Sequence, residues 1–288
     1  MQIDYALILS AGLGTRMGEI GKHLPKVLWP INDTPLLELQ IRYCEELGIK
    51  KIYINTHFLH EQIEKFVLSK KWNIEITLLH ENPLLDSGGA IHNMAARPEI
   101  SYRGNVLLVN ADQFLFFEKK IWQEALVELG DARAALFGIM VNKDSSYNET
   151  VCENNSLLEI KKNAEKNRDY MTYSGLGILK LDGLSRVDGI SKFFESVANF
   201  KKEKVVMVQL QSSEYWDFGT ASIYAKNIFK LFESENTNSW FIDFVKNHNV
   251  FNDKCKNFIS REKRSINLDC SGVFDQDAIV FGNVVQKY

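Results

Sequence analysis

Apolar runs and stretches of helical periodicity alternate over roughly the first half of the chain. Tyr5–Ser10 is a short apolar run typical of a buried strand. Apolar positions then recur at helical spacing from Leu36 to Leu47, and Gly48 is a typical helix end. The cycle repeats, with strands expected at 51–56, 74–80, 105–110 and 133–141, and helices at 59–69, 89–96 and 119–129. This order predicts an α/β fold, a Rossmann-like three-layer α/β/α domain with a mainly parallel central sheet.

The regular alternation weakens after about residue 143. A polar stretch, Asp144–Asn148, is followed by Asn154 and Asn155, a pair typical of a hairpin turn. Extended runs at 157–160 and 170–181 flank a further polar segment. These features predict a small inserted β region.

The α/β pattern returns in the following segment, with a helix expected at 190–200, a strand at 205–210 and a helix from 221 to about 233. We therefore expect one domain over residues 1–235 and an appendage over residues 236–288. The appendage is predicted to be helical first. Its short β pieces, at 273–274 and 278–285, are compatible with the start of a left-handed β-helix coil.

Composition narrows the class of protein. The chain has 288 residues, 45% of them hydrophobic, and 34 Lys and Arg against 37 Asp and Glu. It is therefore expected to be globular, with no nucleic-acid partner, since no segment is strongly basic. The first apolar run is too short for a signal peptide, and no stretch approaches the roughly 20 apolar residues of a membrane span. These features predict a cytoplasmic protein that binds no membrane.

The cysteines form no CxxC pair and are expected to be reduced, structural thiols: Cys44, Cys152, Cys255 and Cys270.

A glycine-rich turn follows the first predicted strand, with the sequence Ser-Ala-Gly-Leu-Gly-Thr-Arg over residues 10–16, and Pro25-Lys26 comes soon after. Backbone N–H groups can approach an anion closely where glycine has no Cβ. Arg16 and Lys26 add two cations, a combination that suits a triphosphate. The dinucleotide motif GxGxxG fails because Met17 occupies the third glycine position, and Walker A fails because Arg16 stands five residues before Gly21. The alternative is a tight turn with solvated cations.

The run Gly-x-Gly-Thr-Arg followed by Pro-Lys resembles the signature of the sugar-nucleotidyltransferase family, and the resemblance spans roughly residues 3–230. It looks closest to N-acetylmuramate 1-phosphate uridylyltransferases and heptose or mannose 1-phosphate guanylyltransferases. The resemblance implies that the turn binds the nucleotide and that Arg16 and Lys26 are catalytic, with Lys26 on the sugar phosphate as well. The implied nucleotide-binding residues of the turn are Ala11, Gly12, Gly14, Thr15 and Arg16.

Two aspartates are candidates for a metal site. Asp112 follows the expected strand 105–110, and Asp217 lies in Trp-Asp-Phe-Gly-Thr over residues 216–220. A lone aspartate at such a position is usually a turn former or a helix cap. The resemblance implies instead that both hold Mg²⁺, the ion that phosphoryl transfer normally requires.

Other segments resemble binding elements of the family. Ser87 and Gly88 open a predicted helix and resemble the element that contacts the base, although Ser87 also suits an ordinary N-cap. Glu81 lies just before and is expected to line the same nucleotide pocket. The resemblance assigns three further residues to the sugar phosphate, although the Glu-Lys pair lacks its usual following proline: Glu159, Ser174 and Gly175.

The resemblance implies an enzyme that condenses a nucleoside triphosphate with a sugar 1-phosphate and releases pyrophosphate. UTP is favoured, because the segments 54–57 and 60–63 resemble the uridylyltransferase most, and GTP is possible. A phosphocholine cytidylyltransferase shares the opening motif and stays open. So does a nucleotide-sugar-dependent glycosyltransferase, although its usual Asp-x-Asp is here Asn-Ala-Asp at 110–112. An inactive nucleotide-binding subunit is disfavoured, because the charged residues expected of an active enzyme are all present: Arg16, Lys26, Asp112 and Asp217. The oligomeric state is left open.

Overall fold

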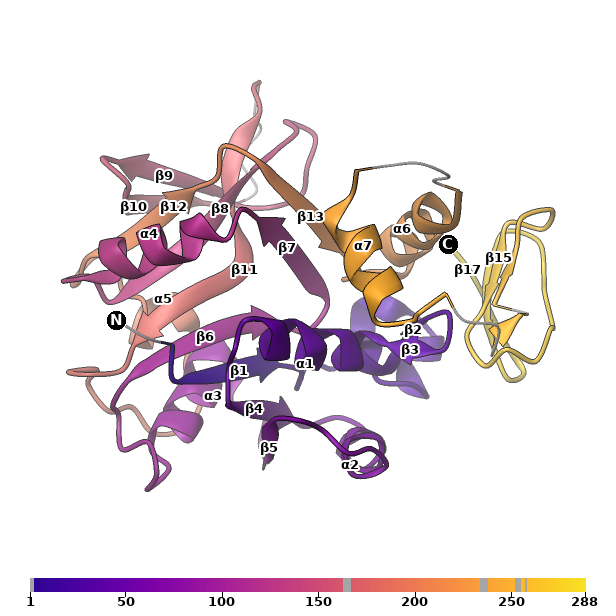
Figure 1. The fold of residues 1–288 in the computed structure, drawn as a ribbon, viewed down its shortest axis with the longest axis horizontal. Coiled ribbons are helices and arrows are strands. Elements are labelled where there is room, and N and C mark those ends of the chain that lie inside the picture. Colours follow the sequence, from indigo (N-terminus) through magenta and orange to yellow (C-terminus); the bar gives the residue numbers. More distant parts are fainter. Residues whose placement is uncertain (1–2, 163–166, 234–237, 252–254, 257) are drawn as a thin grey trace.

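The computed structural model describes residues 3–162, 167–233, 238–251, 255–256 and 258–288. Its centre is a nine-stranded sheet (Figure 1). The strands of this sheet are β1 Tyr5–Leu9, β4 Lys51–Thr56, β5 Glu75–His80, β6 Asn105–Asn110, β8 Ala134–Val141, β9 Glu149–Glu153, β10 Ser156–Lys161, β11 Tyr170–Lys180 and β12 Val205–Gln209. Their order across the sheet is β5-β4-β1-β6-β11-β8-β12-β10-β9.

The predicted α/β fold is confirmed, and the sheet is mixed. Strands β5, β4, β1 and β6 run parallel, as expected for strands joined by helical crossovers. Strand β11 is antiparallel to both of its neighbours, β6 and β8. Strand β12 is parallel to β8, and the hairpin of β9 and β10 extends the sheet at that edge. The carboxyl ends of β1 and β6 therefore lie side by side.

Helices cover both faces of the sheet (Figure 1). Alternate residues of β1 explain why both faces must be covered, since Ala6 and Ile8 are buried in one core and Leu7 in the other. Residues of α1 Leu36–Glu46, α2 His60–Leu68, α4 Lys120–Leu129, α6 Ala221–Glu233 and α7 Trp240–Asn247 join the first core. The second core includes residues of α3 Asp86–Ala95 and α5 Phe193–Ser196.

The inserted β region has the expected hairpin. Asn154 and Asn155 have φ angles of 47° and 62° and connect β9 to β10. Such paired positive φ values are those of the tight turns that suit the twist of a hairpin, and asparagine tolerates them.

Two local differences from the sequence expectation affect the site. The helix expected at 190–200 is confined to the four residues of α5, because Ser191 instead exchanges backbone hydrogen bonds with Leu85 and Gly89. A two-stranded sheet of β7 Gln113–Phe117 and β13 Ser213–Asp217 was not expected. Asp217 is thus the last residue of strand β13.

The C-terminal β pieces form a sheet and not a β-helix coil. It comprises β14 Ile259–Ser260, β15 Ser265–Asn267, β16 Ala278–Phe281 and β17 Val284–Lys287. Strand β16 is parallel to β15, but β17 returns antiparallel to β16, which ends any coil. Residues 273–274 belong to the connection and not to a strand. Ile266 and Ile279 are fully buried in the first core.

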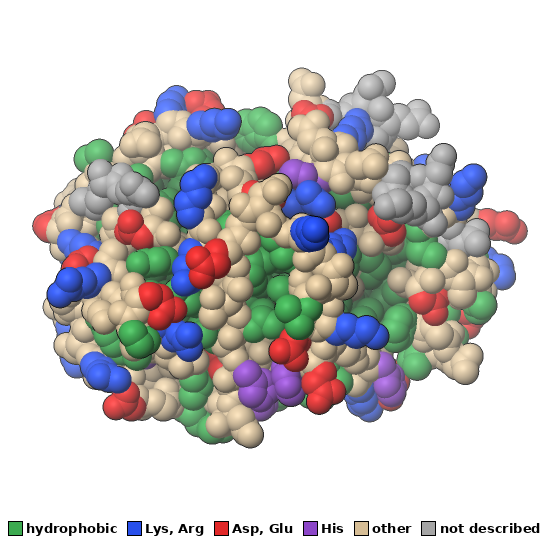
Figure 2. Space-filling model, turned by 60° about the horizontal axis from the view of Figure 1, so that its bottom comes forward, with side chains coloured by type: hydrophobic (Ala, Val, Ile, Leu, Met, Phe, Trp, Pro, Cys, Tyr) green, Lys and Arg blue, Asp and Glu red, His purple; other side chains and the backbone are tan. Residues whose placement is uncertain are grey.

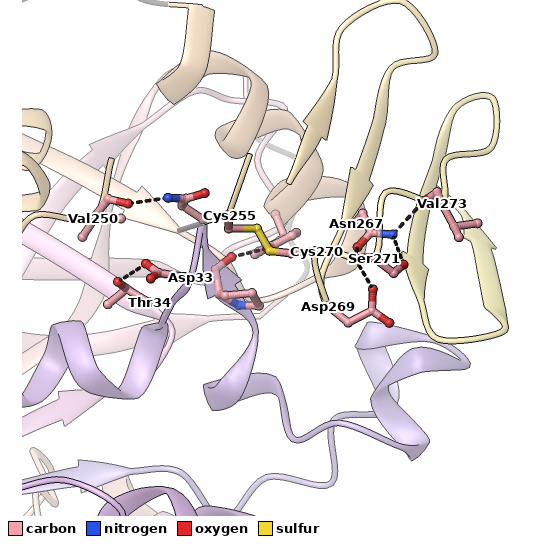
Figure 3. The surroundings of a disulfide bond; sticks show 12 residues. Asp33, Thr34, Val250, Cys255, Asn267, Asp269, Cys270, Ser271 and Val273 are labelled. Atoms are coloured by element: carbon pink, nitrogen blue, oxygen red, sulfur yellow. Dashed lines mark hydrogen bonds between the residues drawn. A yellow bond between two sulfur atoms is a disulfide. The ribbon is translucent and has the colours of Figure 1, made fainter. Parts of the chain in front are cut away.

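The expectation of four reduced thiols is wrong for Cys255 and Cys270, which form a disulfide with Cα atoms 5.6 Å apart (Figure 3). Cys270 lies in a turn after β15 that Asn267 holds, because the Asn267 side chain amide donates to the Ser271 hydroxyl and the Val273 carbonyl. Sequence spacing cannot reveal this turn. Cys44 and Cys152 are free.

The surface carries mixed charge, with Lys and Arg side chains interspersed among Asp and Glu side chains on the face shown in Figure 2. None of the helices within the described ranges has the length and apolar character that a bilayer crossing needs.

Replacing Cys270 tests the disulfide. The bond closes a sequence separation of 15 residues, so Cys270→Ser is expected to lower the free energy of unfolding by about 2–4 kcal/mol in denaturant titrations under oxidising conditions. Cys152→Ser, at a free thiol, is the matched control and should change it by less than about 1 kcal/mol. Four reactive thiols in the denatured, unreduced wild type would show that the bond is absent.

Candidate functional site

The glycine-rich turn leaves the carboxyl end of β1, between the ends of β4 and β6. Ligands of open α/β sheets bind at this edge. Gly14 has a φ of +66° and begins a 3₁₀ turn over Thr15–Met17. Gly12, Thr15 and Arg16 are partly or fully exposed, whereas Ala11 is buried. Arg16 forms no hydrogen bond or ion pair with any residue that the structure describes, so its guanidinium is available to an anion.

The segment after the turn folds back against it. A Cβ on Gly21 would lie 2.7 Å from the Gly14 carbonyl oxygen, so the two backbones meet where neither residue has a side chain. A cavity of about 470 Å³ opens beside this contact. It is lined by Leu13, Gly14, Thr15, Gly18, Glu19, Gly21, Lys22 and Phe58.

The β7 and β13 ladder brings the two predicted metal aspartates together. Asp112 lies between β6 and β7, and the antiparallel register pairs Asp217 with Gln113. The Phe218 N–H donates to the Asp112 carbonyl at 2.8 Å, which extends the pairing past the strand end. A Cβ on Gly219 would lie 2.8 Å from Asp217 Oδ1 and 2.9 Å from Asp112 Oδ2. The two carboxylates therefore converge over Gly219.

Both carboxylates are buried, and each has a partner. Lys26 Nζ lies 2.5 Å from Asp112 Oδ2. Asp217 accepts hydrogen bonds from the Gly219 N–H at 2.6 Å and from the Tyr147 hydroxyl. Burial raises the pKa of Asp217, and the neighbouring Asp112 carboxylate raises it further, against the opposite effects of Tyr147, Gly219 and Lys26. The pair therefore holds more negative charge than one ammonium group neutralises.

Two carboxylates suit a hard divalent cation. Mg²⁺ is usually held by one or two carboxylates, with phosphate oxygens and waters completing its shell. Within the described ranges no three or more His, Cys, Asp or Glu residues form a cluster able to hold a metal, so a cage built from protein alone is absent there. Asp112 and Asp217 fit an ion that is shared with a substrate.

Glu81 is buried and connects three segments at the carboxyl edge of the sheet. Its carboxylate accepts from Asn55 Nδ2 at 2.8 Å and from the Leu85 N–H at 2.9 Å. Asn55 in turn accepts from the Ser10 N–H at 2.7 Å, just before the glycine-rich turn. Both Glu81 oxygens are thus used within the chain. The side chain positions the turn and the start of α3, and it presents no free oxygen to a ligand.

Ser87 and Gly88 differ in their surroundings at the start of α3. Ser87 lines a cavity of about 660 Å³. Gly88 is buried, and a Cβ there would lie 2.5 Å from Ser196 Oγ and 2.7 Å from the Lys192 backbone. Gly88 therefore allows close packing of α3 on the segment before α5, whereas Ser87 faces open space.

The residues predicted for the sugar phosphate also differ. Ser174 is buried, and its hydroxyl donates to the Phe137 carbonyl at 2.8 Å in an irregular part of β11. Gly175 has a φ of +87°, and a Cβ there would overlap the side chains of Asn110 and Gln113. Glu159 is exposed and does not line the cavity.

The 660 Å³ cavity runs from the start of α3 to the ends of β6, β10 and β11. Ile160 and Lys162 line it, and because strand side chains alternate, Glu159 is directed to the other face. Its remaining walls include Leu9, Asn110, Tyr173, Phe193, Phe194 and Phe200.

Sequence reasoning missed two residues that the geometry brings to the site. Tyr147 bonds to Asp217 across 70 residues, from the polar loop before β9, and no local motif predicts such a contact. Asn110 donates to Gln113 Oε1 at 2.7 Å and lines the cavity beside Gly175. A polar residue at the end of an otherwise apolar strand was the available signal for Asn110.

Removing Glu81 tests its positioning role. Glu81→Ala leaves the Asn55 amide and the Leu85 N–H without an acceptor, so the free energy of unfolding should fall by about 2–4 kcal/mol. Urea denaturation measures this loss. The exposed Glu64 on α2 gives a matched control, since Glu64→Ala should stay within about 0.5 kcal/mol of wild type. Equal stability of the two variants would contradict the network.

Relatives and solved structures with similar features are known. A D-glycero-alpha-D-manno-heptose 1-phosphate guanylyltransferase of Aneurinibacillus thermoaerophilus is 29% identical over 149 residues, 49% of this chain and 64% of that protein. A choline-phosphate cytidylyltransferase of Streptococcus pneumoniae is 32% identical over 111 residues, 38% of this chain and 45% of that protein. The matches thus span less than two thirds of either relative.

The fold is that of a solved structure, HddC from Yersinia pseudotuberculosis in complex with GMP-PN, with a TM-score of 0.67 at 20% identity over 79% of this chain and 99% of that chain. A model of the nucleotidyl transferase family matches residues 5–169, more than half of the chain. The glycine-rich turn, Lys26 and Asp112 all lie within this match. The protein therefore belongs to the nucleotidyl transferase family.

Proposed function

We propose that this protein condenses a nucleoside triphosphate with a sugar 1-phosphate, giving a nucleotide sugar and pyrophosphate. One observation carries the proposal: Lys26 and the convergent carboxylates of Asp112 and Asp217 lie at the sheet edge from which the glycine-rich turn emerges. The names of the heptose 1-phosphate guanylyltransferases support GTP, and the sequence segments at 54–57 and 60–63 support UTP.

The reaction would be an in-line attack of the sugar phosphate oxygen on the α-phosphorus. The attacking phosphate monoester is already anionic, so it needs no general base. Asp112 and Asp217 would hold Mg²⁺, which when bound neutralises charge on the phosphates. Arg16, without a partner in the described chain, would bind the triphosphate. Catalysis is then positioning and charge stabilisation by residues that are already gathered at the site before the substrates arrive.

Lys26 has a defined part in this scheme. Its ammonium group lies 2.5 Å from Asp112 and is mostly buried. Because this ammonium group is compact and lies beside the proposed metal ligands, Lys26 can exchange its contact with Asp112 for a contact with a phosphate oxygen after only a small movement. Lys26 would therefore balance the carboxylates in the free protein and the reacting phosphates in the complex.

The 660 Å³ cavity is the proposed acceptor site. Its aromatic walls suit the apolar face of a sugar ring, and Lys162 supplies a cation for an anionic group.

The same cavity favours a second candidate, a cytidylyltransferase for an alcohol phosphate with a cationic head. Tyr173, Phe193, Phe194 and Phe200 gather there, with Phe193 and Phe194 ring centroids 4.8 Å apart. Aromatic clusters of this kind bind quaternary ammonium groups. The choline-phosphate cytidylyltransferase relative makes this the principal alternative.

A pyrophosphate-release assay separates these candidates. It should be run with each of the four NTPs against sugar 1-phosphates and against phosphocholine, with Mg²⁺ and with excess EDTA. Release is expected with UTP or GTP and a sugar 1-phosphate, and EDTA should abolish it. Release only with CTP and phosphocholine supports the second candidate, and no release with any pair would overturn the proposed reaction.

Substitutions at the charged cluster test the mechanism. Lys26→Ala and Asp112→Asn are each expected to lower kcat by at least about 100-fold, because the first removes a cation that stabilises charge on the phosphates and the second removes a carboxylate that would hold Mg²⁺. The exposed ion pair of Lys204 and Asp131, 2.9 Å apart, gives a matched control. Lys204→Ala and Asp131→Asn should leave kcat within about twofold of wild type. Wild-type turnover in a folded Lys26→Ala variant would exclude this mechanism.

Gly219→Ala tests the shared metal site. Its new methyl group would press on both carboxylates, so the Mg²⁺ concentration for half-maximal rate should rise about tenfold or more. The melting temperature should fall only modestly, because Gly219 does not have a positive φ and the atoms that must shift are the ends of two side chains. Ser222→Ala, at an exposed position of α6, is the control. An unchanged Mg²⁺ dependence would place the metal elsewhere.

A further inference from the structure

The C-terminal sheet of β14 to β17 lies at one end of the molecule, beside α6 (Figure 1). Gln286 on β17 reaches from this sheet to the segment that follows the glycine-rich turn. Its Oε1 atom accepts a hydrogen bond from the Ile20 N–H at 3.1 Å, across 266 residues of sequence. Ile20 is fully buried, so this N–H needs a partner from the protein.

Gly18 makes room for the Gln286 side chain. A Cβ on Gly18 would lie 2.5 Å from Gln286 Oε1 and 2.6 Å from its Cδ atom. Gly18 also has a φ of +68°, a conformation that other residues rarely adopt. The glycine directly after Arg16 and Met17 is therefore required both by the backbone bend and by the docked amide.

The contact is transmitted to the turn through the backbone. Ile20 opens a 3₁₀ turn over Ile20–Lys22, and its carbonyl accepts from the His23 and Leu24 N–H groups at 2.9 Å. Gly21, in the middle of this turn, packs on the Gly14 carbonyl. Fixing Ile20 therefore fixes the surface against which Gly14 and Met17 pack, the residues on either side of Thr15 and Arg16.

The C-terminal sheet is itself held by α6. The Arg261 guanidinium donates to the Phe232 carbonyl at 2.7 Å, and Arg264 lies over the Phe229 ring at 5.3 Å. The Tyr288 ring is 6.4 Å from the Phe229 ring. Helix α6 begins four residues after Asp217, and Asn227 on it donates to the Asp217 carbonyl at 2.7 Å. The sheet thus contacts both the segment that follows the glycine-rich turn and helix α6, which follows Asp217.

We propose that the C-terminal sheet is a brace for the nucleotide site, with Gln286 as a positioning residue for the glycine-rich turn. Gln286 does not line the cavity beside the turn, so it acts through Gly18 and Ile20 and not on the nucleotide. The inference rests on the proposed function in assigning the turn to a nucleoside triphosphate. It predicts that the brace affects nucleotide binding more than the chemical step.

Three variants separate this role from general stability. Gln286→Ala removes the acceptor, and Gln286→Glu retains an oxygen for the Ile20 N–H. Lys287→Ala, on the adjacent residue, breaks an exposed ion pair with Asp275 and a hydrogen bond to the Gln276 carbonyl, both in the connection between β15 and β16, but no contact with the turn. Each full-length variant is measured for the Kd of the four NTPs with Mg²⁺, for KM and kcat, and for Tm.

The expected result is a Kd and KM for the preferred NTP that rise about three- to tenfold in Gln286→Ala, the effect of one lost hydrogen bond. The KM for the acceptor and kcat should stay within twofold, Gln286→Glu should recover most of the loss, and Lys287→Ala should match wild type. Unchanged Kd in Gln286→Ala would overturn the brace. So would equal losses in Gln286→Ala and Lys287→Ala, which would indicate general destabilisation.

Binding and turnover distinguish the two proposals. If the wild type binds an NTP without releasing pyrophosphate, the proposed reaction is wrong and the brace is still judged by the Kd values. If the wild type binds none of the four NTPs, both proposals are wrong.

Discussion

The convergence of two buried carboxylates is the constraint on which the rest of the site depends. Asp112 and Asp217 meet because β7 pairs with β13 and because Gly219 has no side chain to separate them. Burial is the main cause of the raised pKa of Asp217, and repulsion from the neighbouring Asp112 carboxylate adds to it. Lys26 offsets one charge. The remaining charge makes the site suited to a divalent cation, so the arrangement that is unfavourable in the free protein is the one that favours the proposed ion.

Much of this site was predictable because its signals are local. The glycine-rich turn and Lys26 are close in sequence, and their residue types favour an anionic ligand. The alternation of apolar runs and helical periodicity predicted the α/β fold, which the structure confirms. Asp112 was located correctly at a strand end, since an apolar run that ends in a polar residue marks the carboxyl edge of a buried sheet.

The features that sequence reasoning missed depend on long-range contacts. Tyr147 and Gln286 act across 70 and 266 residues, and neither belongs to a recognisable motif. Glu81 was predicted as a pocket residue. It is buried, and its carboxylate accepts hydrogen bonds from the Asn55 amide and the Leu85 N–H, so it positions the glycine-rich turn and the start of α3. The short β7 and β13 strands escaped detection because their aromatic residues pack against Phe241 of α7, a contact that no local periodicity reveals. The disulfide was missed for the same reason, since the spacing of its cysteines forms no recognisable motif and only the folded chain brings them together.

The C-terminal sheet changes how the glycine-rich turn should be understood. Glycine gives a backbone freedom to approach a phosphate, but that freedom costs conformational entropy when the loop is ordered. A turn that must hold one conformation before substrate binds therefore needs packing contacts from the rest of the protein. Gly21 against Gly14 supplies part of it, and Gln286 against Gly18 and Ile20 supplies the rest. Because Ile266 and Ile279 join the main core, this support is built into the fold and does not depend on the disulfide alone. Gly18 and Gly21, in the segment after the turn, thus allow the rest of the chain to pack against it, while Gly12 has no atom of the described chain near the position of a Cβ and leaves the turn open to a ligand.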